Sequence, residues 1–245
     1  MGLRAAIRFL TIVPVRGGDV PPGRAAAFFP LVGAGIGAAG AGVYLLAHAA
    51  FPVSIAALAT VAFWTVISGV LHEDGLADVA DAVRAGRSRE RILAILKDSR
   101  IGTFGAVAIL LSVLARWQAL EYLATPRVVE VLIASQAVPR AAMVAMAWCS
   151  RPVESGTGPG LGFALASTLS TPAAVAAIAQ GAAAALVCGW RPGLIMIAGS
   201  VLIVQAARGW FYRRLGGING DCLGFTEQVL EILVLVMFTC GSCRW

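Results

Sequence analysis

The sequence predicts an all-α integral membrane protein, a single domain over residues 1–245 that forms a polytopic bundle of about seven transmembrane helices. Of the 245 residues, 59% are hydrophobic and only 13% are charged, whereas an ordinary soluble domain has about a quarter charged residues. So few charges cannot cover the surface of a soluble protein of this length, which disfavours a very apolar soluble helical protein. The lengths of the apolar stretches and the placement of the basic residues support the same prediction.

A transmembrane helix needs about 20 mostly apolar residues, and seven stretches approach this length. No long linker, charged tail or internal repeat separates them, so we expect one domain. Near the N-terminus, arginines interrupt any apolar core that a cleavable signal peptide would need. The predicted spans are about 31–50, 54–71, 104–123, 128–150, 172–190, 194–210 and 222–240.

The distribution of Lys and Arg predicts which ends of the spans face the cytoplasm. With the N-terminus inside, 14 of the 19 basic residues fall on inside segments, three on outside segments (Arg127, Arg191 and Arg244) and two within spans. This asymmetry predicts an N-in, C-out topology, with the spans in contact with membrane lipid. The net charge of +6 does not indicate nucleic-acid binding, because the basic residues flank apolar spans instead of lining a groove.

Arg116 and Arg140, the two basic residues inside spans, are costly to place in hydrocarbon. Arg140 follows Pro139 near the middle of its span, so we expect it to face a polar cavity or a carboxylate. For Arg116, this interpretation and an arginine that extends to the lipid headgroups both remain open. Glu231 lies deep in the last span, where it fits either a functional role or pairing with a buried arginine such as Arg140.

An acidic cluster follows the second predicted span. Asp74, Asp78 and Asp81 stand at i, i+4 and i+7, which places them on one face of a helix. Like charges at this spacing destabilise a helix, and a divalent cation would offset their repulsion. Carboxylate oxygens suit Mg²⁺ or Mn²⁺, with Glu73 as a further ligand, whereas a merely solvated acidic face is disfavoured by the small apolar residues in between. His72 fits a metal ligand, a phosphate donor or a capping and packing residue.

Residues 97–105 combine basic, hydroxyl and glycine residues, among them Lys97, Ser99 and Arg100. This mixture suits a pyrophosphate, because Lys and Arg neutralise its charge and glycines let backbone N–H groups approach it. A basic loop beside a membrane often has a similar composition. The interpretation as a pyrophosphate site therefore depends on the nearby aspartates.

A second acidic site precedes the last span, where four glycines surround Asp221 in residues 216–224. This composition indicates a tight turn that presents Asp221, and Glu227 follows inside the last helix. Two acidic sites with a basic, glycine-containing segment between them predict metal-assisted phosphoryl transfer, in which one acid orients or deprotonates an attacking hydroxyl. The residues alone do not identify the substrate.

At these residues the sequence resembles the cobalamin synthase family, adenosylcobinamide-GDP ribazoletransferase, nearly from end to end. The order of several motifs makes the resemblance specific. Ala82, Phe104 and Asn219 stand where the family often has Gly, Tyr and Thr, which affects a phenol role at 104 and a hydroxyl role at 219 but not the acidic positions. The matching motifs are Arg8–Thr11, Phe29–Gly33, His72–Asp78, Lys97–Thr103, Pro139–Met143 and Gly220–Gly224.

The resemblance implies an Mg²⁺-dependent enzyme of the cytoplasmic membrane that joins adenosylcobinamide-GDP to α-ribazole or its 5′-phosphate. The ribazole 3′-hydroxyl attacks the cobinamide-linked phosphorus, and GMP leaves. A homo-oligomer, or a complex with other enzymes of cobalamin synthesis, is left open. We expect catalytic roles for Asp78, Asp221 and Glu227, metal binding by Glu73, Asp74, Asp78 and Asp81, and substrate binding by His72, Lys97, Ser99, Arg100 and Arg140.

Two other functions compete with this prediction. Membrane phosphotransferases that use CDP-activated alcohols also combine aspartates with a metal, but the spacing of their signature is not found, since Ala82 and Val83 follow Asp81. A cation transporter would place its acidic residues near the middle of the membrane, and only Glu231 supports this. The pair Cys240 and Cys243 has metal or redox spacing but no supporting ligands nearby.

Overall fold

The computed structural model describes residues 1–17, 20–83, 88–96, 98, 100–123, 125–153 and 160–240. In these residues the regular structure is helical, apart from an isolated bridge between Pro152 and Ile218, so the all-α prediction is confirmed. The elements are α1 (Gly2–Leu10), α2 (Pro22–Ala25), η1 (Ala26–Phe28), α3 (Phe29–His48), α4 (Val53–Ile67), α5 (Leu71–Val83), α6 (Arg89–Ile95), α7 (Thr103–Tyr122), η2 (Thr125–Arg127), α8 (Val128–Trp148), α9 (Leu161–Thr168), α10 (Thr171–Val187), α11 (Trp190–Leu215) and α12 (Gly220–Met237).

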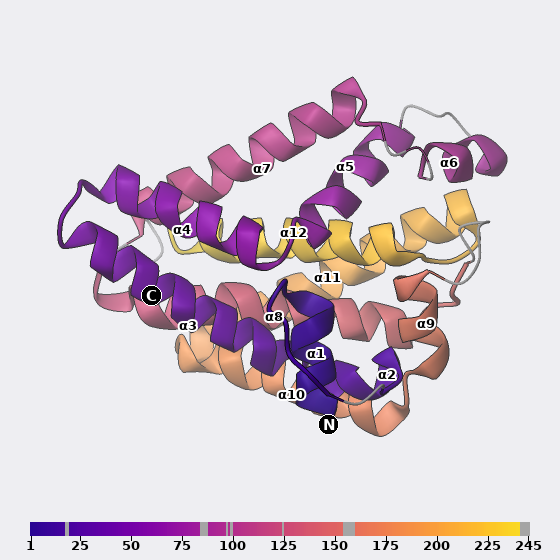
Figure 1. Cartoon of the computed structure of the whole chain (residues 1–245), viewed down its shortest axis with the longest axis horizontal. Coiled ribbons are helices and arrows are strands. Elements are labelled where there is room, and N and C mark those ends of the chain that lie inside the picture. The colour runs from indigo at the N-terminus through magenta and orange to yellow at the C-terminus, as the bar shows by residue number, and fades with distance from the viewer. Residues whose placement is uncertain are drawn as a thin grey trace.

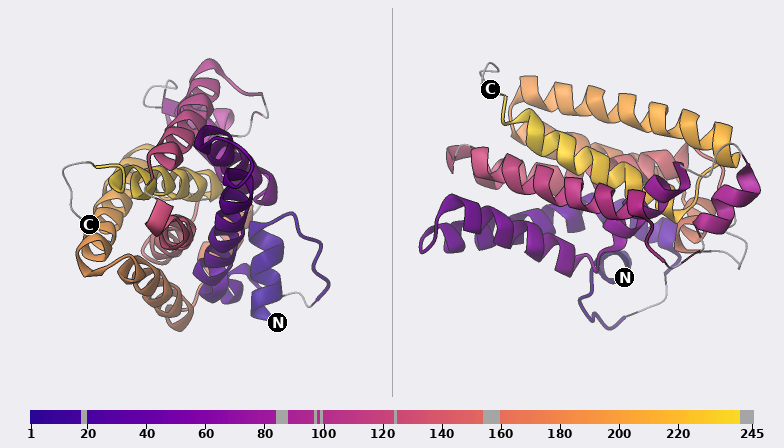
Figure 2. Two further views of the ribbon diagram at one scale, coloured as in Figure 1. Left: turned by 90° about the vertical axis from the view of Figure 1, so that its left-hand side faces the viewer. Right: turned by 90° about the horizontal axis from the view of Figure 1, so that it is seen from above.

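Helix α8 is the centre of the bundle, as the end-on view in Figure 2 shows. It packs against α3, α10 and α12, and 78% of its most apolar stretch is buried. Glycines of α3 allow the closest of these contacts, because a Cβ on Gly33 or Gly37 would clash with the backbone carbonyls of Gln136 or Leu132. The glycine-rich composition of the first predicted span therefore serves helix packing.

Four helical segments of the described chain are long and apolar enough to cross a membrane: Pro22–His48, α7, α8 and α11. The number rises to six if each of two bent pairs counts as one span, α4 with α5 (88° apart) and α9 with α10 (106° apart). The predicted count of seven is not confirmed. Helix α12 is absent from this group because its 18 residues include Asp221, Glu227 and Glu231; it packs among α5, α7, α8 and α11 instead.

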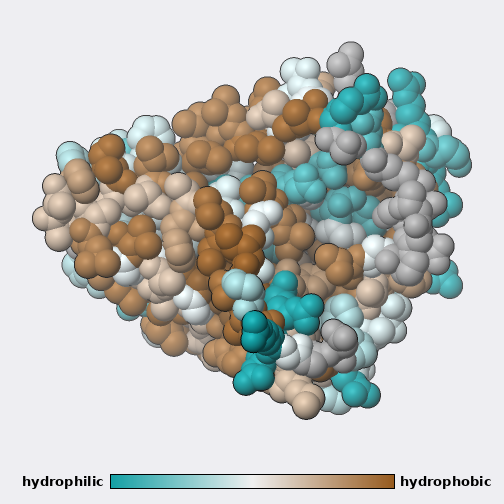
Figure 3. Space-filling model, in the orientation of Figure 1, coloured by the Kyte–Doolittle hydropathy of each residue, from teal (hydrophilic) through white to brown (hydrophobic). Residues whose placement is uncertain are grey.

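Polar residues gather at one end of the bundle. Figure 3 shows a largely apolar surface over the left part of the molecule and hydrophilic residues at the right. The right-hand end holds α6, α9, the end of α5 and the start of α12 (Figure 1). The acidic motifs of the sequence thus lie at the polar end of an apolar helical bundle.

Candidate active site

A strained turn starts the acidic helix α5. Gly69 has φ 63° and Val70 has φ 61°, and a left-handed conformation is rare for a β-branched residue. The N–H of Val70 donates to the carbonyl of Thr65 at 3.0 Å, which ends α4, and the chain then leaves at 88° to it. Such strain persists only where the surrounding structure enforces it, and here it fixes the direction in which α5 leaves α4.

Two glycines bring α5 and α12 into close contact. A Cβ on Gly75 would lie 2.9 Å from the carbonyl oxygen of Asp221, and one on Gly224 would lie 3.2 Å from the carbonyl oxygen of His72. The sequence did not indicate that these glycines face each other. Their contact explains why each acidic motif contains glycine, since it brings the first turns of the two helices together.

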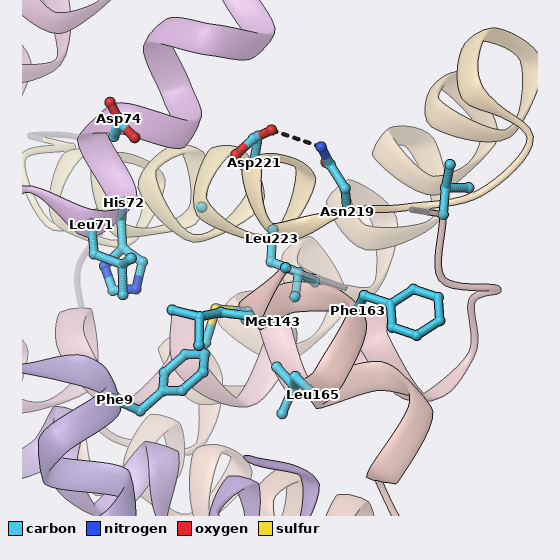
Figure 4. Close-up of a pocket in the computed structure, with 16 residues that line it drawn as sticks. Phe9, Leu71, His72, Asp74, Met143, Phe163, Leu165, Asn219, Asp221 and Leu223 are labelled. Carbon is cyan, nitrogen blue, oxygen red and sulfur yellow. Dashed lines mark hydrogen bonds between the residues drawn. The ribbon is translucent and has the colours of Figure 1, made fainter. Parts of the chain in front are cut away.

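This contact brings Asp74 and Asp78 of α5 close enough to Asp221 of α12 for their charges to interact. The charges of Asp221 and Asp74 act on Asp78, and that of Asp74 acts on Asp221. Burial raises the pKa of Asp221 to about 6, although a hydrogen bond from Asn219 opposes the shift. That bond runs from Asn219 Nδ2 to Asp221 Oδ2 at 2.7 Å (Figure 4), and Asn219 Oδ1 also caps α12 through the N–H of Cys222.

The carboxylate of Asp81 accepts hydrogen bonds from backbone N–H groups at the start of α7. Its Oδ2 accepts from the N–H of Gly102 at 2.7 Å, and its Oδ1 accepts from the N–H of Gly105 at 2.9 Å. A Cβ on either glycine would clash with the same carboxylate. The negative charge also suits the N-terminus of a helix, so Asp81 holds α7 against α5.

The predicted pyrophosphate segment is only partly described. Lys97 and Ser99 lie outside the described residues. The guanidinium of Arg100 is 87% exposed and binds Asp98, with Nη2 to Oδ2 at 2.6 Å. Hydrogen bonds from Arg100 lower the pKa of Asp98 to about 2. Arg100 is therefore at the polar end but paired with its neighbour, and its role toward a substrate stays a prediction.

Glu73 points away from Asp74, Asp78 and Asp221 and into the bundle. Its Oε1 lies 3.1 Å from Nη1 of Arg116, and the same nitrogen lies 3.2 Å from Oε1 of Glu231. Thr65 Oγ1 adds a hydrogen bond to Glu73 at 3.1 Å. All three charged side chains are at most 2% exposed. Arg116 therefore faces carboxylates inside the bundle and does not extend to the lipid headgroups.

Arg140 pairs with Glu227, as an arginine facing a carboxylate should. Its Nη1 contacts Glu227 Oε1 and lies 3.9 Å from Oε2 of Glu231, so Glu231 is closer to Arg116 than to Arg140. His72 Nδ1 lies 3.3 Å from Glu227 Oε2 and 3.5 Å from Arg140 Nη2. Glu227 is fully buried. These contacts place Glu227 and His72 behind Asp74, Asp78 and Asp221, where they hold α12 against α5 and α8.

A cleft of about 220 Å³ opens beside Asp74 and Asp221. The two carboxylates lie on one side of it, whereas the side chains of Phe9, Met143 and Leu165 form an apolar side (Figure 4). The apolar residues come from α1, α8 and α9, far apart in sequence. Sequence analysis missed this cleft, because apolar residues in a membrane protein give no signal that separates a cleft wall from a lipid-facing surface.

In the described part of the chain, no three His, Cys, Asp or Glu side chains are grouped closely enough to hold a metal ion by themselves. The structure brings Asp74, Asp78 and Asp221 together, and gives Glu73 and Asp81 other partners. The predicted metal and catalytic roles of these residues therefore stay predictions.

Comparison with known proteins agrees with the resemblance seen in the motifs. The family model of cobalamin-5-phosphate synthase matches residues 2–239. An adenosylcobinamide-GDP ribazoletransferase of Geotalea daltonii is 37% identical over 240 residues, covering 94% of each chain. Proteins of the same name are 40% identical in Ralstonia nicotianae (86% of this chain and 83% of the relative) and 38% identical in Bradyrhizobium diazoefficiens (96% and 92%).

No solved structure matches the chain. The family match extends over residues 2–239, so it includes the two acidic motifs, the α7 segment and the residues that line the cleft. The relatives are named as transferases, which is the class of enzyme that the acidic and basic motifs predict. The chain therefore belongs to the cobalamin-5-phosphate synthase family, the transferases that act in cobalamin synthesis.

Proposed function

We propose that this enzyme joins adenosylcobinamide-GDP to α-ribazole or its 5′-phosphate, with release of GMP, at the polar end of the bundle. The names of the relatives supply the substrates. The observation that carries the choice of site is the convergence of Asp74 and Asp78 from α5 with Asp221 from α12 beside an open cleft. Phosphoryl transfer depends mainly on positioning and charge stabilisation, and this group of residues can supply both.

Asp74 and Asp78 would hold an Mg²⁺ ion. They are one helical turn apart on the same face of α5, and their mutual repulsion is the condition that a cation relieves. Mg²⁺ is usually bound by one or two carboxylates together with waters and substrate phosphates, so a preformed set of three protein ligands is not required. When bound, the ion would neutralise charge on the pyrophosphate of the donor substrate.

Asp221 is the proposed general base. The 3′-hydroxyl of the ribazole forms a new bond to the cobinamide-linked phosphorus, the phosphoanhydride bond breaks, and GMP departs with the bonding electrons. The hydroxyl proton passes to the Asp221 carboxylate. A base with a pKa near 6 is ionised at neutral pH yet basic enough to accept a proton in the transition state, and Asn219 holds this carboxylate by its hydrogen bond.

The remaining predicted residues act at a distance from the reacting atoms. Asp81 positions the segment before α7, and Glu73 with Arg116 holds the start of α5. Glu227, Arg140 and His72 hold α12 against α5 and α8. Lys97, Ser99 and Arg100 would contact the pyrophosphate of the donor substrate.

The polar end would face the cytoplasm of an inner-membrane protein. The excess of Lys and Arg on segments at this end supports that orientation under the positive-inside rule. The substrates carry nucleotide and phosphate groups that are cytoplasmic metabolites, so the orientation also suits their supply.

The test is turnover by the purified protein in detergent or liposomes. With adenosylcobinamide-GDP, α-ribazole 5′-phosphate and Mg²⁺, we expect stoichiometric GMP and a cobalamin product that both disappear with EDTA and return with added Mg²⁺. Asp78→Asn should lack turnover but insert and fold normally, and Glu121→Gln, on the far end of α7, is the matched control. Full activity in Asp78→Asn would contradict the metal assignment, and absent GMP release by well-folded wild-type protein would contradict the proposed function.

A further inference from the structure

The cleft beside Asp221 has the character of a site for a flat apolar ring. Small-molecule sites are typically apolar clefts with a few converging polar groups, and this cleft, of about 220 Å³, combines an apolar side with a carboxylate side. Figure 4 shows Phe9, Met143 and Leu165 on one side and Asp74, Asp221 and Asn219 on the other, with Phe163 toward one end. Phe9 is held in place by the ring of Phe29, at 5.0 Å between centroids.

A buried nitrogen in the cleft wall has no hydrogen-bond partner in the described part of the chain. His72 lines the cleft and is 2% exposed. Its Nδ1 faces Glu227 and Arg140, whereas its Nε2 has no hydrogen-bond partner among the described residues. Leaving a buried polar atom unpaired is unfavourable. A ligand that supplies a hydrogen-bond partner for this nitrogen therefore gains binding free energy.

A second, more open pocket of about 540 Å³ adjoins the cleft. Phe9 and Leu161 line both pockets, and Arg8 is the charged residue that lines the second. Arg8 precedes Phe9 on α1 and also donates to the carbonyl of Gly17 at 3.2 Å. A guanidinium presents its donors in a planar fork that matches a phosphate group. A negative site and a positive site therefore lie in adjoining pockets that share the apolar side chains of Phe9 and Leu161, and we call these two pockets together the passage.

We propose that this passage binds the acceptor nucleoside, with its aromatic base between Phe9 and Phe163, and that Arg8 binds its 5′-phosphate. The inference rests on the proposed function and extends it by assigning the acceptor subsite. The ribose hydroxyl that attacks lies toward Asp221. The acidic end is assigned to the Mg²⁺ ion and the donor pyrophosphate, so the acceptor's own phosphate points the other way, to Arg8. Arg8 is then the residue that distinguishes the phosphorylated acceptor from the free nucleoside.

The donor substrate fits this passage less well. Its guanine base is rich in hydrogen-bonding groups, whereas the passage walls are mainly apolar, and its corrinoid is far larger than the cleft. The phosphate on Arg8 has another source to consider, because Arg8 lies on a helix near the polar end, where lipid headgroups also carry phosphate. The experiment must therefore separate a substrate phosphate from a lipid phosphate.

The decisive variants are Arg8→Gln, Arg8→Lys and Phe163→Ala, with Arg4→Gln as the matched control. Arg4 is exposed on the same helix, one turn from Arg8, and does not line either pocket. Binding of α-ribazole and of its 5′-phosphate is measured by equilibrium dialysis without the donor substrate, so the reading does not need turnover. Steady-state KM values for both acceptors and for the donor follow, in neutral phosphatidylcholine vesicles and in vesicles with added anionic lipid.

We expect Arg8→Gln to weaken binding of the 5′-phosphate at least about tenfold, the usual effect of losing a charge-assisted hydrogen bond, and to leave binding of the free nucleoside nearly unchanged. Arg8→Lys should keep most of the preference, and Arg4→Gln all of it. Phe163→Ala should raise KM for both acceptors and not for the donor.

Several results would overturn the proposal. Equal weakening of both acceptors by Arg8→Gln, or an effect seen only with anionic lipid, would assign Arg8 to a headgroup. A raised donor KM in Phe163→Ala would assign the cleft to the other substrate. Binding of neither acceptor to the wild type would remove the acceptor subsite, whereas acceptor binding without GMP release would preserve the subsite and contradict the proposed function alone.

Discussion

The carboxylate of Asp81 on α5 accepts the backbone N–H of Gly102, at 2.7 Å and 21 residues further along the chain. With the second bond to Gly105, it joins the acidic helix to the start of α7. Its position at i+7 from Asp74 predicted a third metal ligand, and its charge also acts on Asp78. The structure shows a structural use for this carboxylate, the link between α5 and α7, and its metal role stays a prediction.

Asp81 and Asp78 should consequently respond differently to substitution. Asp81→Ala should destabilise the protein by roughly 1–3 kcal/mol, the cost of unpaired backbone donors, and lower kcat without changing the Mg²⁺ dependence. Asp78→Asn should lower kcat by about 100-fold or more, the usual effect of losing a group that stabilises transition-state charge, with unchanged or higher thermal stability. Mg²⁺ titrations of activity, together with melting curves, measure both. A raised Mg²⁺ requirement in Asp81→Ala would return Asp81 to the metal site.

The contact of Gly75 with α12 should be intolerant of any side chain. In Gly75→Ala the new Cβ would lie 2.9 Å from the carbonyl oxygen of Asp221, a separation that real Cβ contacts do not show, so α5 and α12 must move apart. We expect a lower melting temperature and a large loss of kcat. The matched control is Gly42→Ala, because a Cβ there meets nothing within 4 Å and alanine favours a helix by up to about 1 kcal/mol. Equal behaviour of the two variants would contradict the role of the contact.

Arg116 should be essential for stability, not chemistry. It lies between Glu73 and Glu231 in the bundle interior. Its removal leaves Glu73 without this counter-ion and Glu231 with only the more distant Arg140, at 3.9 Å. Breaking a buried pair costs about 3–5 kcal/mol, so Arg116→Gln should melt far below the wild type. The double variant Arg116→Gln with Glu73→Gln should recover part of this loss, because it removes one stranded charge. If the double variant is as unstable as the sum of the single variants, the two residues are not coupled.

Sequence analysis located the helices and the acidic motifs because both depend on local pattern. The ranges expected for 31–50, 104–123 and 128–150 match α3, α7 and α8 closely. The prediction for 172–190 includes most of α10 but not its 106° bend from α9, since a bend depends on packing with other helices. Sequence reasoning also treated 222–240 as a span, which is not confirmed, since α12 covers this range but carries three acids, of which Glu231 pairs with Arg116 and Glu227 with Arg140.

The parts of the site that sequence reasoning did not find are those made by contacts distant in sequence. Nothing near Gly75 indicates that it faces Gly224, and nothing near Phe9 places it beside Asp221. The partner of Arg116 was open for the same reason, since three buried glutamates lie at different positions along two helices. Composition showed that buried charges must pair, but only the helix packing determines which pairs form.

The pH dependence of turnover should follow Asp221. Its pKa is raised to about 6 by burial, and the ionised form accepts the proton. Burial also raises the pKa of Asp78, to about 7, so the profile is measured at saturating Mg²⁺, which keeps that carboxyl ionised. Under this condition kcat/KM should fall as the pH decreases through about 6. Folding responds in the opposite sense, because a carboxyl with a raised pKa in the folded state binds protons more readily there than when unfolded. Its contribution to the free energy of unfolding therefore grows as the pH falls through about 6, so the loss of activity is not acid denaturation.

Asn219 provides the control for this assignment. Its hydrogen bond to Asp221 lowers the carboxyl pKa, so Asn219→Ala should move the acidic limb of the kcat/KM profile to higher pH. The substitution also removes the cap of α12, which costs about 0.5–2 kcal/mol. Asn219→Asp keeps a capping oxygen but adds a negative charge and cannot donate, so it should shift the limb further in the same direction while remaining folded. An acidic limb that stays in place in both variants would show that a group other than Asp221 accepts the proton.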